Sequence, residues 1–108
     1  MECVPCHGGT APLRGAALRS LLRSLGHGWK TVEDHRLEKE FKFDDFKSAL
    51  AFTNRVGEVA EEQGHHPDIH LAWGRARVVL WTHAVEGLTQ NDFILASKIE
   101  GLSRPGSS

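Results

Sequence analysis

The sequence predicts a single α+β domain in which helices cover one face of an antiparallel sheet. Apolar residues recur every three or four positions in three segments and every second position in others. The expected elements therefore follow in the order α-β-β-α-β-β-α. Strands that follow one another through short turns pair as hairpins, so the helices between and around the two hairpins must cover the sheet. A chain of 108 residues has the usual size of one such domain.

The first half of the chain gives a helix and a hairpin. The helix is expected to begin after Pro12 and to end at Gly26. Four leucines at spacings of three and four form its apolar stripe: Leu18, Leu21, Leu22 and Leu25. A short strand at residues 29–32 and a second strand at residues 37–43 follow. In the second strand apolar and charged residues alternate, which predicts a strand with one buried face.

A long helix is expected in the middle of the chain, with Asp44 or Asp45 as its N-cap and Gly64 as its stop. The second hairpin follows, with strands at residues 68–73 and 76–82. Gly74 and Arg75 are the expected turn between these strands.

The last helix is expected to begin at Thr89 and to end at Gly101. This pattern divides the chain into a flexible arm at residues 1–11, one domain at residues 12–101 and a disordered tail at residues 102–108.

Bulk composition excludes several classes of function. With 13 basic and 14 acidic residues the formal net charge is -1, and no basic stripe indicates direct binding to nucleic acid. No apolar run is long enough to span a bilayer and no signal segment opens the chain, so we expect no membrane association and a cytoplasmic location.

Cys3 and Cys6 fit the C-x-x-C-H pattern of haem attachment with His7. The motif starts too close to the first residue for that reading. A zinc site would need a second cysteine pair, so a reduced tail is the expected state.

Four of the seven histidines lie between Glu61 and Asp92: His65, His66, His70 and His83. Two imidazoles at one pocket can give and take protons at neutral pH, which suits the elimination of water. A zinc site from the same four side chains is the alternative, although neighbouring residues seldom both bind one tetrahedral metal. His70 alternates along a strand and is expected to be structural. Spacing alone leaves proton transfer and metal binding open.

Two carboxylates in this window also have structural explanations. Thr89-x-x-Asp92 forms a capping box, in which Asp92 stabilises the start of the last helix. Glu61 can be a solvated position beside Glu62.

The pattern Glu61-x3-His65-His66-Pro67-x5-Trp73-x9-His83-x8-Asp92 resembles the signature of the pterin-4a-carbinolamine dehydratases. The surrounding sequence is similar to that family from about residue 12 to residue 100, including Trp29 and the Phe41-x-Phe43-x-x-Phe46 run. The resemblance implies a four-stranded antiparallel sheet with helices on one face, assembled as a homodimer or homotetramer. It also implies the dehydration of 4a-hydroxytetrahydropterin to quinonoid dihydropterin without a metal or organic cofactor, which recycles the pterin of aromatic amino acid hydroxylases.

The same resemblance assigns roles to individual residues. His65 and His83 would carry the acid–base steps, and His66 would hold the substrate. Glu61 and Asp92 would orient the histidines. The remaining substrate-binding positions would be Pro67, Trp73 and Thr82.

Two residues depart from the family pattern. Gly64 stands where some members have Asp, and Ile69 stands where others have Trp. Some proteins of this family act without catalysis, as a dimerisation cofactor of a transcription factor or as an assembly factor. A non-catalytic binding module is therefore the alternative function.

Overall fold

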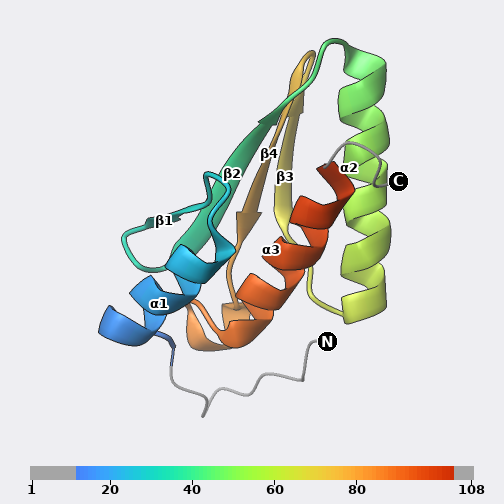
Figure 1. The fold of residues 1–108 in the computed structure, drawn as a ribbon. Helices are drawn as coiled ribbons and strands as arrows, with labels where there is room; N and C mark the ends of the chain where they lie inside the picture. Colours follow the sequence, from blue (N-terminus) through green and yellow to red (C-terminus); the bar gives the residue numbers. More distant parts are fainter. Residues whose placement is uncertain (1–11, 104–108) are drawn as a thin grey trace.

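The computed structural model describes residues 12–103, which form three helices on one face of a four-stranded antiparallel sheet (Figure 1). The elements are α1 (Gly15–Leu25), β1 (Lys30–Val32), β2 (Arg36–Lys42), α2 (Phe46–Gln63), β3 (Asp68–Ala72), β4 (Arg75–Leu80), the short 3-10 helix η1 (His83–Val85) and α3 (Gln90–Ser103). The strands lie in the order β1-β2-β4-β3. The predicted α+β class and element order are confirmed.

The core forms between the helices and one face of the sheet. Alternation along β2 and β4 points their apolar side chains toward the helices, and α2 and α3 supply the opposing residues. The apolar residues that β2 and β4 place on this side are all buried: Leu37, Phe41, Ala76, Val78 and Leu80. The rings of Phe41 and Phe52 lie 4.6 Å apart and join β2 to α2. We call the opposite, uncovered side of the sheet the open face. It carries charged residues, among them Glu38 and Arg77 with 3.7 Å between their charged groups.

The turn between β3 and β4 differs from the sequence prediction. Ala72 pairs with Arg75, so the two loop residues are Trp73 and Gly74 instead of Gly74 and Arg75. The reason is a close approach to the neighbouring connection. The Phe43 N–H donates to the Gly74 carbonyl at 2.8 Å, and a Cβ on Gly74 would lie 3.0 Å from the Phe43 carbonyl oxygen. The glycine is therefore needed at the second loop position.

Two boundaries also differ. Helix α3 continues to Ser103, past the end predicted at Gly101, because Leu102 packs against the core. Strand β4 ends at Leu80, and Thr82 forms an isolated bridge with Gly87. Cys3 and Cys6 lie outside the described residues, as do the predicted arm and residues 104–108. No helix within residues 12–103 is long and apolar enough to cross a membrane.

Helix α2 connects the two ends of the sheet. Asp45 caps its start beside the β3–β4 turn, where one Asp45 carboxylate oxygen accepts from the Ser48 N–H at 2.7 Å. Helix α2 ends with Gln63, and its end lies at the other end of the sheet, where α3 begins (Figure 1). The segment that follows Gln63 contains the predicted histidine pair. The fold therefore brings the end of α2, the end of β4 and the start of α3 to one end of the sheet.

Candidate active site

His65 is positioned by the way helix α2 ends. Gly64 adopts a left-handed conformation (φ 65, ψ 26), which a residue without a side chain reaches most easily. The His65 N–H then donates to the Ala60 carbonyl at 3.2 Å, so the chain turns directly after the helix. The backbone of His65 is therefore held by this hydrogen bond, independently of its side chain.

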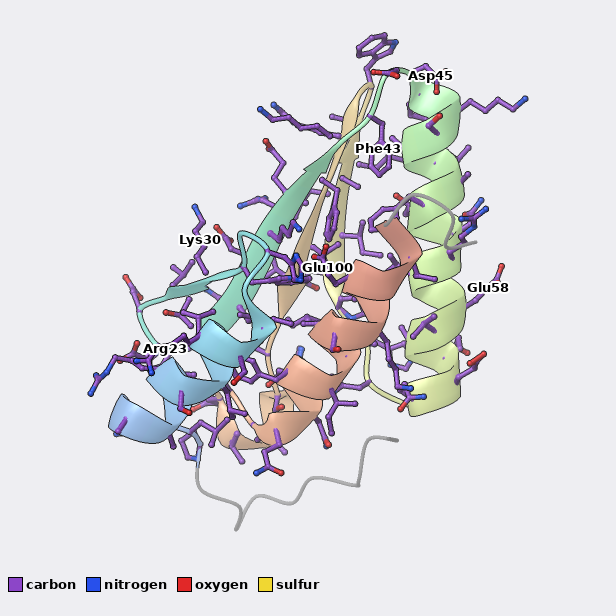
Figure 2. The ribbon with its side chains drawn as sticks, in the orientation of Figure 1. Arg23, Lys30, Phe43, Asp45, Glu58 and Glu100 are labelled. Carbon is purple, nitrogen blue, oxygen red and sulfur yellow. The ribbon has the colours of Figure 1, made fainter. Side chains whose placement is uncertain are left out.

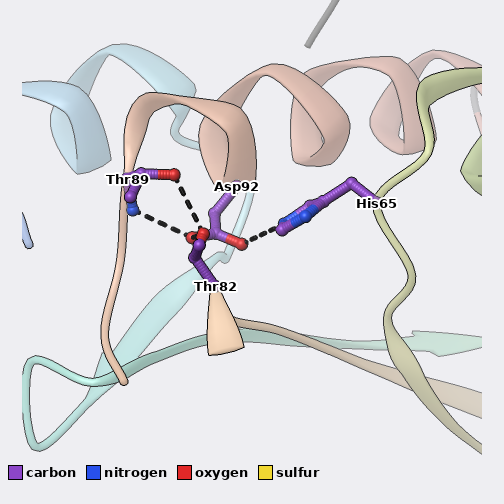
Figure 3. A network of polar contacts seen from close by, with 4 residues as sticks. All are labelled: His65, Thr82, Thr89 and Asp92. Atoms are coloured by element: carbon purple, nitrogen blue, oxygen red, sulfur yellow. Dashed lines mark hydrogen bonds and ion pairs between the residues drawn. The ribbon is translucent and has the colours of Figure 1, made fainter. Parts of the chain in front are cut away.

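The imidazole of His65 contacts a buried carboxylate in the first turn of α3. Its Nε2 lies 2.6 Å from Asp92 Oδ1, and the Asp92 side chain has no exposed surface. The other Asp92 oxygen, Oδ2, accepts from the Thr82 hydroxyl at 2.8 Å and from the Thr89 N–H at 2.9 Å (Figure 3). The Thr89 contact is one half of the predicted capping box, so Asp92 caps α3 and supports His65 at once.

The donors around Asp92 determine what His65 can do. An ionised carboxylate can only accept hydrogen bonds. Asp92 Oδ2 already accepts two, so Oδ1 is satisfied when it accepts one from a His65 Nε2–H. That arrangement places a proton on His65 Nε2 and leaves Nδ1 as a lone-pair nitrogen. In this tautomer the Nδ1 lone pair can accept a proton, and the His65 side chain is 14% exposed.

Thr82 connects the site to the sheet. It is buried, and its hydroxyl lies 2.9 Å from that of Thr89. The Thr82 N–H donates to the Gly87 carbonyl at 2.8 Å, which closes the loop that carries η1. Thr82 therefore fixes the distance between the end of β4 and the start of α3.

His66 and Glu61 form a second histidine–carboxylate pair, between His66 Nε2 and Glu61 Oε2. Both side chains are mostly exposed, so the pair adds little to the stability of the fold. Its effect is to orient the His66 ring at the surface beside His65.

His83 lies at the same end of the sheet. β3 and β4 are antiparallel and Asp68 pairs with Val79, so the residues before Asp68 and the residues after Val79 lie at the same end of the two strands. His83 directly follows Thr82, is exposed and opens η1. Its ring stacks on that of Trp81, with centroids 4.0 Å apart.

Pro67 also lies at this end of the sheet, in the short link from His66 to β3, and is half-buried. Two other residues of the predicted window, Trp73 and His70, do not lie there. Trp73 is 69% exposed in the β3–β4 turn, at the opposite end of β3 from His65. His70 is exposed and lies opposite Arg77 in the sheet. Among residues 12–103, no three His, Cys, Asp or Glu side chains are grouped closely enough to hold a metal ion.

Sequence reasoning missed two contributors to this site. Thr89 was identified only as a helix start, although its N–H and hydroxyl both belong to the network around Asp92. Trp81 was identified only as a strand residue, although it stacks on His83. The capping-box spacing signals the role of Thr89. Alternation along β4 places Trp81 on the same side of the strand as residue 83, which is the available signal for Trp81.

Comparison with known proteins decides the family. The family model described as pterin 4 alpha carbinolamine dehydratase matches residues 11–102. This chain belongs to the pterin 4 alpha carbinolamine dehydratase family. A Rubrobacter xylanophilus protein provisionally named as a pterin-4-alpha-carbinolamine dehydratase is 52% identical over 101 residues, covering 94% of each chain. One from Alkaliphilus metalliredigens, with the same provisional name, is 44% identical over 92% of this chain and 89% of its own.

Two solved structures have a similar fold. The crystal structure of a Brucella melitensis transcriptional coactivator/pterin dehydratase is 32% identical, with a TM-score of 0.81 over 86% of this chain and 99% of that one. A pterin dehydratase-like protein identified as a RuBisCO assembly factor of the alpha-carboxysome has a TM-score of 0.63 at 24% identity, over 78% of this chain and 96% of that one. The second likeness concerns the fold alone.

Proposed function

We propose that the protein dehydrates 4a-hydroxytetrahydropterin to quinonoid dihydropterin by histidine acid–base catalysis. The observation that carries this proposal is the contact between His65 Nε2 and the buried Asp92 carboxylate at 2.6 Å. A binding module has no need for an imidazole oriented by a buried charge, whereas a general base does. The names of the relatives in the family support the same activity.

The reaction requires two proton transfers and one bond cleavage. The proton on N5 of the pterin passes to His65 Nδ1, and the N5 electron pair forms a double bond to C4a. The C4a–O bond breaks as its electrons leave with the oxygen. A protonated His83 donates to the departing hydroxyl, so the oxygen leaves as water and not as hydroxide.

Each histidine returns to its starting state after the product leaves. His65, which gained a proton, loses it to solvent, and His83 regains one. Both side chains reach solvent: His83 is exposed and the His65 side chain is 14% exposed. His66, oriented by Glu61, holds the pterin beside them, and Pro67 and Thr82 shape that side of the pocket. This chemistry consists of proton transfers, so the proposal includes independence from metal ions.

The physiological role that follows is recycling of the pterin used by aromatic amino acid hydroxylases. We place the protein in the cytoplasm and expect it to form a homo-oligomer. Hydroxylases of this kind release the 4a-hydroxypterin that the proposed reaction consumes. An assay can generate that substrate in place with such a hydroxylase and follow the appearance of quinonoid dihydropterin. The purified protein should accelerate this reaction above its spontaneous rate.

Variants at His83 and His70 make the assay decisive. His83→Ala should lower kcat roughly 100-fold, the lower range of what one acid–base residue contributes. His70→Ala removes an exposed imidazole away from the site and should keep the wild-type rate. A folded protein with no acceleration would refute the dehydratase proposal. Loss of activity with a chelator, restored by added metal, would refute the metal-free mechanism.

A further inference from the structure

Trp81 contacts His83, an exposed histidine that is proposed to act as the acid. The rings of Trp81 and His83 are stacked, with centroids 4.0 Å apart and planes inclined by 27°. The guanidinium carbon of Arg36 lies 5.1 Å from the centroid of the same indole. The indole is thus in contact with a cation from β2 and with the imidazole of His83.

The sheet register explains how these three residues meet. Leu37 pairs with Leu80, so the next step of the same ladder sets Arg36 opposite Trp81, both on the open face. Thr82 is extended (φ -100, ψ 109), which returns His83 to the side of the strand that carries Trp81. Backbone geometry therefore aims the imidazole at the indole before any stacking occurs.

The indole nitrogen shows that Trp81 is not held by a hydrogen bond. Its Nε1 is buried and has no hydrogen-bond partner among the described residues. A buried N–H without a partner lowers stability, and a phenylalanine would fill this position without that cost. The ring contacts with His83 and Arg36 are the specific interactions that Trp81 does make.

We propose that Trp81 is a positioning residue that holds the His83 imidazole, through the stacked ring contact, in the orientation for proton transfer. This inference rests on the proposed function, because it assigns Trp81 a role in the same reaction. Trp81 acts through His83 and does not itself exchange protons.

The stack changes how often His83 is in its productive orientation. An exposed histidine at the start of a short 3-10 helix otherwise exchanges among side-chain rotamers. The preference of one aromatic ring for another biases such a population by roughly twofold to twelvefold. Loss of the ring should reduce kcat by a factor in that range. KM should change little, because the fraction of His83 in its productive orientation affects the proton-transfer step more than it affects substrate binding.

The first experiment detects the stack without any enzyme assay. In the wild-type protein, NMR should show the His83 ring protons shifted upfield by the indole, with His83→Ala used to assign them. Trp81→Ala should remove this shift. Trp81→Phe keeps an aromatic ring and should retain part of it. An unshifted His83 signal in the wild-type protein would overturn the proposal.

The second experiment measures kinetics in three variants. Trp81→Ala should lower kcat roughly twofold to twelvefold, and Trp81→Phe should restore most of it while matching or exceeding the wild-type free energy of unfolding. Val79→Ala is the matched control: it removes a buried side chain from β4, two residues before Trp81 and on the same face. Its kcat should stay at the wild-type value even where its stability falls.

The outcomes separate this inference from the proposed function. An active enzyme whose kcat is unchanged in Trp81→Ala overturns the positioning role alone. A reduction of the same size in Val79→Ala also overturns it, because general weakening of β4 would then explain the effect. A wild-type protein without dehydratase activity overturns both, even where the NMR shift shows that the stack exists.

Discussion

Asp92 and His65 are joined across 27 residues of sequence by a 2.6 Å contact between a carboxylate without exposed surface and an imidazole that still reaches solvent. One end of this pair is fixed by the start of α3 and the other by the end of α2. The contact therefore sets the distance between two helices as well as the orientation of a proposed base.

Asp92→Asn tests the electrostatic part of this contact. The amide keeps the shape of the side chain but removes the charge that orients and supports the His65 imidazole, so kcat should fall roughly 100-fold. The loss should appear in protein that is still folded by circular dichroism. Asp45→Asn is the control, because it makes the same change at the N-cap of α2, where asparagine caps equally well. Equal rates in the two variants would contradict the role of Asp92.

Thr82→Val tests the support beneath Asp92. Valine keeps the branched shape but removes the hydroxyl that donates to Asp92 and contacts Thr89, and the site is buried. We expect the free energy of unfolding to fall by about 1–3 kcal/mol in urea titrations. Thr53→Val, which removes a half-buried hydroxyl bonded to the Ala49 carbonyl, should cost less. A larger loss at Thr53 would contradict this ranking.

A second buried carboxylate, Glu100, predicts how stability depends on pH. It lies between α3 and the sheet (Figure 2), where its Oε1 accepts from Lys39 Nζ at 2.7 Å and from Trp29 Nε1 at 3.0 Å. Burial raises the pKa of Glu100, but the hydrogen bonds from Lys39 and Trp29 and the charges of Lys39 and His27 outweigh it. The net pKa is lowered from 4.5.

The sign of the effect follows from that direction. A carboxyl whose pKa is lower in the folded state stabilises the protein above its unfolded pKa, and this contribution is lost as pH falls through the folded pKa. Glu100→Gln should therefore cost roughly 2 kcal/mol near pH 7. Thermal melts should show the gap between the two proteins narrowing below pH 4.5. A gap that stays constant down to acid pH would contradict the linkage.

Trp73→Ala tests whether the exposed turn takes part in the reaction. Trp73 lies at the far end of β3 from His65 and is 69% exposed. Within one chain its ring does not reach the site, so kcat/KM should change less than about twofold, and stability by less than about 0.5 kcal/mol. A large loss of kcat/KM in a stable variant would mean that the ring reaches a site on a second copy of the chain.

Much of the fold was predictable because its determinants are local. Alternation at Leu37 and Phe41 identified β2, and the residues around Asp45 and Gly64 bounded α2 within a residue. The β3–β4 turn was misplaced because the choice of Trp73-Gly74 depends on the Phe43 backbone, which is distant in sequence. No local pattern carries that contact.

Some contacts of the site were also predictable from local sequence, and others were not. The Thr89-x-x-Asp92 spacing predicted the cap that the structure shows. That the other oxygen of the same carboxylate contacts His65 depends on the packing of α2 against α3, which the spacing does not encode. The Trp81–His83 contact depends on an extended Thr82, which continues the alternation of side chains past the end of β4; the start of η1 at His83 has no such local signal.

The first described residues hold the loop that leads into α3. The Leu13 N–H donates to the Leu88 carbonyl at 2.7 Å, and a Cβ on Gly87 would lie 2.9 Å from Pro12 Cβ. Pro12 and Leu13 therefore hold in place the segment that carries Thr89 and Asp92. A truncated or N-terminally fused variant should keep both residues. Truncation at the first residue of α1 would leave every helix and strand intact but would weaken the support of His65.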